Sequence, residues 1–100
     1  MVAAAYIIEH NMTIRFRNND VLVYGTRADF DDFMYIAFEY TPVHTFYMDK
    51  LPYTVYSYHN TDDCCITRKF DKGYRILNPN DEMLEYLYRI DDDIESRNRV

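Results

Sequence analysis

Adjacent carboxylates are the residues whose spacing in this sequence could most directly support catalysis. Asp31–Asp32, Asp62–Asp63 and Asp91–Asp92–Asp93 place acids side by side. Glycoside hydrolysis needs two carboxyl groups on opposite sides of the scissile bond, and a chain of 100 residues has little material for the cleft between them. We therefore interpret these acids as solvated or as facing a binding partner.

Thiols and imidazoles could supply a nucleophile or a metal site. Cys64 and Cys65 are adjacent, while His10, His44 and His59 stand at no spacing that matches a known metal-ligand motif. Neighbouring strand residues point to opposite faces, so we expect two reduced thiols, one buried and one exposed. A catalytic pair of either thiol with His44 stays as a third hypothesis, because the partners need only meet in space.

The loops that phosphate or acyl chemistry requires are absent from the sequence. It contains 2 Gly, too few for a phosphate-binding loop, and neither Ser57 nor Ser96 lies in a nucleophile-elbow motif. We predict that the protein is not an enzyme. We also predict that it holds no metal and no cofactor.

Tyrosine is unusually abundant, with 11 Tyr beside 6 Phe and no Trp. Tyrosine is enriched at binding hot spots because it is large and rigid and has one polar end. Several tyrosines gather in one β-rich segment beside an acidic turn, although helices could also cover that segment. The residues predicted to bind a partner are Tyr53, Tyr56, Tyr58, Asp62, Asp63, Asp91, Asp92 and Asp93.

The net charge is −6, from 17 Asp and Glu against 11 Lys and Arg. This sign argues against direct nucleic-acid binding, which needs clustered cations to neutralise phosphates. It favours attraction to a basic protein. The predicted partner is therefore a basic, nucleic-acid-binding enzyme such as a nuclease, bound by a monomer or a homodimer of this chain.

The first half of the chain predicts three strands and a helix. The strands are Val2–Ile8, Met12–Arg17, which alternates apolar and polar residues, and Val21–Tyr24. Thr26 caps a helix that ends near Thr41, because Pro at the next position disfavours helical geometry. The apolar stripe of this helix is Phe30, Phe33, Met34, Ala37 and Phe38.

The second half predicts further strands and a long helix. Residues 43–50 form a loop or a short strand, and Gly73 supplies a left-handed turn position between two later strands. Asn78 caps the last helix and Pro79 starts it. The later strands are Tyr53–His59, Cys64–Phe70 and Tyr74–Leu77, and the helix stripe is Met83, Leu87, Ile90 and Ile94.

The element order is therefore β-β-β-α-β-β-β-α, with hairpins and no βαβ repeat. This order predicts an α+β fold, with an antiparallel sheet of about five to six strands and two amphipathic helices. One domain spans residues 1–100. The apolar run at Val2–Ile8 is too short to span a membrane, and we predict a cytoplasmic protein.

The leading functional hypothesis is a non-enzymatic inhibitor that blocks a nucleic-acid-processing enzyme. Two settings suit a small, acidic, tyrosine-rich domain by analogy of class: a phage or mobile-element counter-defence protein of the anti-CRISPR kind, or an immunity protein against a bacterial nuclease toxin. The alternative is a small-ligand or nucleotide-binding module that stacks bases on an aromatic sheet face. That alternative predicts Arg15, Arg17, Arg68 and Lys69 on one exposed face.

Overall fold

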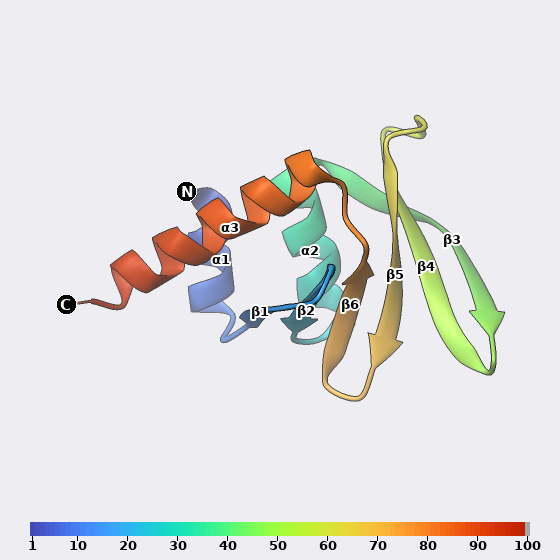
Figure 1. Ribbon diagram of the computed structural model, residues 1–100, viewed down its shortest axis with the longest axis horizontal. Helices are drawn as coiled ribbons and strands as arrows, with labels where there is room; N and C mark the ends of the chain where they lie inside the picture. The colour runs from blue at the N-terminus through green and yellow to red at the C-terminus, as the bar shows by residue number, and fades with distance from the viewer. Residues whose placement is uncertain (100) are drawn as a thin grey trace.

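A computed structural model describes residues 1–99 as an antiparallel six-stranded sheet and three helices. This α+β fold confirms the predicted class, with one helix more than expected at the N-terminus. Figure 1 shows the helices packed together beside β1, β2 and β6, while the β3–β4 hairpin extends away from them. The elements are α1 (Val2–Glu9), β1 (Thr13–Arg17), β2 (Asp20–Tyr24), α2 (Arg27–Phe38), β3 (Tyr40–Met48), β4 (Leu51–Tyr58), β5 (Cys64–Phe70), β6 (Gly73–Leu77) and α3 (Asp81–Arg97).

The strand order in the sheet is β1-β2-β6-β5-β4-β3. Strands β3 to β6 form a meander through successive hairpins, and β6 then pairs with β2 of the N-terminal hairpin. Strands β1 and β3 are consequently the two edges. Within residues 1–99, no helix is both long enough and apolar enough to cross a membrane.

The core lies between the helices and one face of the sheet, which we call the inner face. Both predicted helix stripes are buried there, with Phe30 and Phe33 from α2 and Leu87 and Ile90 from α3 fully enclosed. Successive side chains of a strand point to opposite faces of the sheet. Because the helices cover the inner face, every second residue of each strand faces the core and the others face away. The strand residues in the core are Ile14, Val21, Val23, Tyr40, Tyr56, Cys65, Tyr74 and Ile76.

The predicted strand at Val2–Ile8 is wrong, because these residues form α1. A short apolar run fits a buried strand or a buried helix equally well. Alanine is the strongest helix former, and helical spacing places Ala3, Ala4 and Ile7 together against α2 and α3. The run is therefore a third covering helix.

Of the two alternatives for residues 43–50, a loop or a short strand around Thr45–Met48, the strand is confirmed. It is longer than predicted, because β3 runs from Tyr40 to Met48. Helix α2 ends at Phe38, since Glu39 adopts a left-handed conformation (φ 57°) that starts the strand at once. Pro42 is tolerated because β3 is an edge strand, where one side of the backbone has no partner. A bulge follows between Pro42 and His44.

Two predicted local roles are also corrected. The cap of α3 is Asn80, whose side chain accepts a hydrogen bond from the Met83 amide at 2.8 Å, rather than Asn78. Gly73 has no left-handed backbone and lies within β6. Its role is close approach, because a Cβ there would lie 2.2 Å from the Val23 carbonyl oxygen of β2.

A hydrogen bond between Tyr56 and Asp31 ties β4 to α2. The Tyr56 ring is fully buried against Phe30, and its hydroxyl donates to Asp31 Oδ1 at 2.5 Å. Burial, reinforced by this bond, raises the pKa of Tyr56 far above its ordinary value. Arg27 holds the same carboxylate at 3.3 Å. The hydroxyl therefore stays protonated and paired inside the fold.

We predict that Asp31→Ala lowers the free energy of unfolding by about 2 kcal/mol, because it leaves the buried Tyr56 hydroxyl without a partner. Tyr56→Phe should cost less, since it removes the hydroxyl and leaves Asp31 paired with Arg27. Urea denaturation of both variants and the double variant measures the coupling. Equal losses in the two single variants would contradict this assignment.

Candidate functional site

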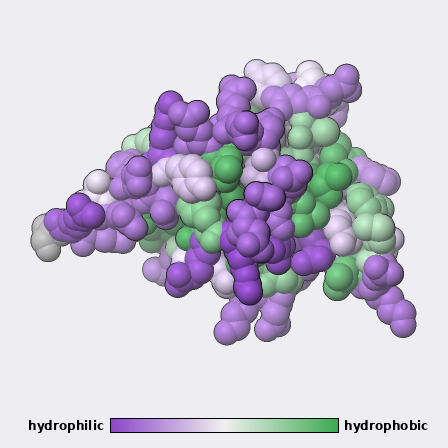
Figure 2. All heavy atoms as spheres, viewed as in Figure 1, coloured by the Kyte–Doolittle hydropathy of each residue, from purple (hydrophilic) through white to green (hydrophobic). Residues whose placement is uncertain are grey.

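The face of the sheet that points away from the helices, here called the outer face, collects arginines and aromatic rings. Strand register places six of its side chains in one row that crosses all six strands. Figure 2 shows the right-hand part of this face, where hydrophobic side chains gather over β4 and β5. In strand order the row reads Arg15, Leu22, Arg75, Arg68, Tyr53 and Phe46.

Arg68 and Arg75 lie directly opposite each other on β5 and β6. Like charges in this position destabilise a strand pair. Asp20 compensates one of them, since Arg75 Nε donates to its Oδ2 at 2.8 Å. The other oxygen of Asp20 accepts from the Asn78 amide at 2.7 Å, and within residues 1–99 no ion pair reaches Arg68. The pair therefore retains an unneutralised positive charge on the outer face.

Aromatic rings flank this arginine pair on two sides. Phe46 stacks on Tyr53, the neighbour of Arg68, with ring centroids 5.3 Å apart and planes 11° apart. His44 extends the stack at 6.0 Å from Phe46. Two residues along the strands, Tyr24 and Phe70 lie on either side of Gly73 and meet edge to face at 5.3 Å. The rings are half-buried, so they present both an ordered surface and free ring area.

An apolar row beside the arginines completes the face. Leu77 pairs with Ile66, which in turn pairs with Val55 on β4. Ile66 is 41% exposed at the centre of this row. Exposed apolar surface of this kind, next to polar groups, is typical of a binding site.

Charge is divided between the two sides of the molecule. Arg15 and Arg17 of β1 are exposed on the outer face, which also carries Arg68 and Arg75. Within the six described strands, Asp20 is the one acidic residue. Most carboxylates lie instead on α2, on α3 and in the turns. The net charge of −6 is therefore no guide to the sign of the outer face.

The alternative hypothesis had grouped Arg15, Arg17, Arg68 and Lys69, and the structure places three of these four on the outer face. Lys69 points to the inner side, with its amine 5.7 Å from the centre of the Tyr74 ring. Sequence reasoning missed Arg75 as a member of the face. Its alternation with Tyr74 and Ile76 indicated its side of the strand, but not its neighbour on β5.

The predicted partner-binding tyrosines do not form one surface. Tyr53 lies on the outer face, while Tyr56 is enclosed in the core by its bond to Asp31. Tyr58 is 39% exposed at the end of β4, on the helix side. Asp62 is exposed in the following turn, and Asp63 there accepts a hydrogen bond from Tyr40 at 2.5 Å. That bond and burial raise the pKa of Tyr40.

The predicted acids of α3 lie far from this turn, as Figure 1 shows: they belong to the half of α3 that leads to the C-terminus. Asp93 accepts from the N-terminal amine at 2.7 Å and from Arg97, which lowers its pKa. Desolvation raises the pKa of the half-buried Asp91, while Asp92 is exposed. Asp93 thus fastens the N-terminus of the chain to α3.

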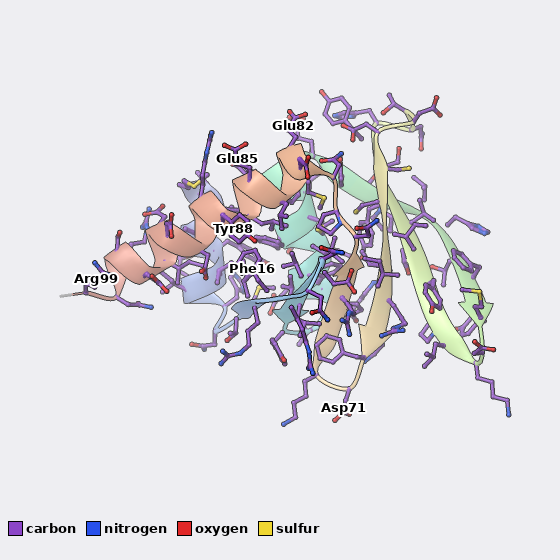
Figure 3. All side chains as sticks on the ribbon, viewed as in Figure 1. Phe16, Asp71, Glu82, Glu85, Tyr88 and Arg99 are labelled. Atoms are coloured by element: carbon purple, nitrogen blue, oxygen red, sulfur yellow. The ribbon has the colours of Figure 1, made fainter. Side chains whose placement is uncertain are left out.

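A cavity of about 400 Å³ opens where α2, α3 and the ends of β3 and β4 meet. It brings together Tyr58 and Asp63, two of the predicted residues, with Tyr86 from α3. Glu82 and Glu85 line the same cavity, and Figure 3 shows where they project from the first turns of α3. The cavity therefore combines aromatic walls with the carboxylates of Asp63, Glu82 and Glu85 and with Arg89, which lies 3.7 Å from Glu85.

The two cysteines are free and lie on opposite faces of β5, as their adjacency predicted. Cys64 is exposed, whereas burial raises the pKa of the Cys65 thiol to about 12. Among residues 1–99, no three His, Cys, Asp or Glu side chains gather at metal-binding distance. Cys65 is therefore a core residue, since only the thiolate is nucleophilic.

We predict that a thiol reagent at pH 8 modifies one cysteine rapidly in the folded protein and both in denaturant. Cys64 is exposed, while Cys65 is buried and fully protonated at this pH. Mass spectrometry of proteolytic fragments identifies the labelled residue. Rapid native labelling of Cys65 would contradict the burial seen here, and Cys64→Ser is the matched control that should abolish the fast phase.

Comparison with known proteins yields no relative for this arrangement: no family model matches the chain, and neither a curated protein nor a solved structure matches it. Function must therefore be argued from the geometry of the outer face and of the cavity.

Proposed function

We propose that this protein is a non-catalytic binding protein whose outer face binds single-stranded nucleic acid. The observation that carries the proposal is the cross-strand pair Arg68–Arg75, with one aromatic pair beside it across the strands and another along them, on the sheet face that the helices leave uncovered. The proposal follows the nucleotide-binding alternative. It departs from the expectation, drawn from net charge, that nucleic acid is not a direct partner.

The chemistry of a nucleic-acid strand matches both kinds of side chain on the outer face. Guanidinium groups hold phosphate oxygens through paired hydrogen bonds, and an anion between Arg68 and Arg75 would relieve their mutual repulsion. Bases stack on rings such as Tyr53 and Phe46 at about 1–3 kcal/mol per base. A small nucleotide would use only one of the aromatic pairs, whereas a strand can reach both.

The size of the face also suits a strand. Six strands spaced about 4.8 Å apart make a surface roughly 24 Å across. Single-strand binders with comparable platforms engage about 4–16 nucleotides. The row from Arg15 to Phe46 crosses the whole of this width, with its arginines on β1, β6 and β5 and its rings on β4 and β3. A strand laid along it would meet the arginines first and then the two rings.

We predict that Arg68→Ala weakens binding of a labelled oligonucleotide of about 12 residues by roughly ten-fold, because it removes one phosphate contact. The slope of log K against log salt should fall in magnitude by about 0.7. Fluorescence anisotropy across a salt series measures both quantities. Arg89→Ala is the control, since Arg89 is an exposed arginine of α3 on the acidic side.

Tyr53→Ala should also weaken the complex while leaving the salt slope unchanged, because stacking releases no counterions. If the unmodified protein binds neither DNA nor RNA strands at low salt, the proposal fails. If Arg89→Ala weakens binding as much as Arg68→Ala, the outer face is not the site.

The cavity supports a second candidate function, the inhibition of a basic nucleic-acid-processing enzyme. Tyr58, Asp63, Glu82 and Glu85 line one opening, which suits a lysine or arginine side chain of a partner. A tyrosine wall with carboxylates at the rim is the surface that the leading sequence hypothesis required. Phage counter-defence and toxin immunity both remain open under this candidate.

For this candidate, we expect the double variant Glu82→Lys/Glu85→Lys to abolish inhibition of a purified nuclease partner, because charge reversal would repel its basic side chain. Inhibition of nuclease activity as a function of protein concentration provides the measurement. Glu9→Lys on α1 is the control for an equally exposed acid outside the cavity. Full inhibition by the double variant would place the interface elsewhere.

A further inference from the structure

The two edges of the sheet differ in length and in charge. Strand β1 spans five residues and carries Arg15 and Arg17. Strand β3 spans nine residues, Tyr40–Met48, and none of them is charged. Natural sheets protect exposed edges with short strands, charged side chains, Pro or bulges. Edge β1 has the first two of these protections.

Edge β3 is protected only at its start. Pro42 and the bulge before His44 interrupt the first half of the strand. The segment His44–Met48 is regular, lies against β4 on one side, and has no strand on the other. Its side chains are largely exposed, with Tyr47 at 72% and Met48 at 52%. This leaves a row of backbone amides and carbonyls available to another strand.

We propose that β3 of one molecule pairs antiparallel with β3 of a second copy, about a two-fold axis near Phe46. This register pairs His44–Met48 with itself and keeps Pro42 and the bulge outside the ladder. A symmetric pairing of this kind is isologous, because the same strand contributes both halves of the interface.

Charge permits a second copy at this edge. The surface of a molecule with net charge −6 generally repels its like, but β3 itself brings no charge into the interface. Glu39 precedes the strand, and Asp49 and Lys50, whose formal charges cancel, follow it. Antiparallel pairing moves the Asp49–Lys50 turn of each copy toward the Glu39 end of the other, which brings no net charge to that end.

The pairing would also join the outer faces of the two copies into one continuous surface. A two-fold axis perpendicular to the sheet keeps both outer faces on the same side, so the Phe46–Tyr53 stack of one copy meets that of the other. The combined sheet would have twelve strands, with a platform about 53 Å wide at about 4.8 Å per strand spacing. The dimer itself rests on the edge strand and not on the proposed function, which is tested separately.

Light scattering after size-exclusion chromatography, with no nucleic acid present, tests the pairing. We expect a dimer mass that falls toward the monomer on dilution. Tyr47→Lys should raise the dimer dissociation constant by about ten-fold or more, because it places like charges on facing edges. Tyr35→Lys, which changes an exposed tyrosine of α2 that is 49% accessible, should leave the dimer unchanged.

A mixture separates loss of pairing from loss of folding. Tyr47→Lys and Tyr47→Glu should each be monomeric alone, and an equal mixture should recover the dimer mass, because their charges become complementary across the axis. A monomer at every concentration of the unmodified protein would overturn the proposal. A dimer that Tyr47→Lys and Tyr35→Lys weaken equally would overturn its assignment to β3.

Discussion

The packing of all three helices on a single face of the sheet is the constraint on which the rest of the structure depends. Phe30 and Phe33 of α2 fill the centre of that layer, and the bond between Asp31 and Tyr56 fixes the helix to β4 with no buried hydroxyl left unpaired. A chain of this size has enough apolar residues for one such core. Within residues 1–99, no helix covers the other face, which is therefore left to solvent.

The outer face carries more arginines and aromatic rings than contact with water alone would require. Solubility alone would be served by mixed charges and small polar residues. The face carries instead four arginines, one acidic strand residue and several half-buried rings. Placing Arg68 against Arg75 lowers stability, and departures of this kind from local rules concentrate at functional sites.

Much of the fold could be predicted from periodicity, because burial imposes it directly. The stripes of α2 and α3, the alternation in β1 and the opposite sides of Cys64 and Cys65 all follow from one covered face. The helical state of Val2–Glu9 could not be predicted, since an apolar run fits either state. The row through Arg68 and Arg75 could not be predicted either. It depends on how β6 pairs with β5 and β2, and β2 lies far from β6 in the sequence. The predicted tyrosine cluster does not form, because strand alternation places Tyr53 and Tyr56, three residues apart in β4, on opposite faces of the sheet.

The division of charge between the outer face and the helices makes the molecule an electric dipole as well as an anion. In the field of a polyanion, a net-negative body is repelled as a whole, but a torque turns its positive end toward the source. Rotation of this kind precedes contact and is strongest at low ionic strength, where the Debye length, about 30 Å at 0.01 M, is comparable with the size of the protein. For the nucleic-acid target proposed above, the acidic helices would favour approach with the outer face forward and oppose the other orientations before contact.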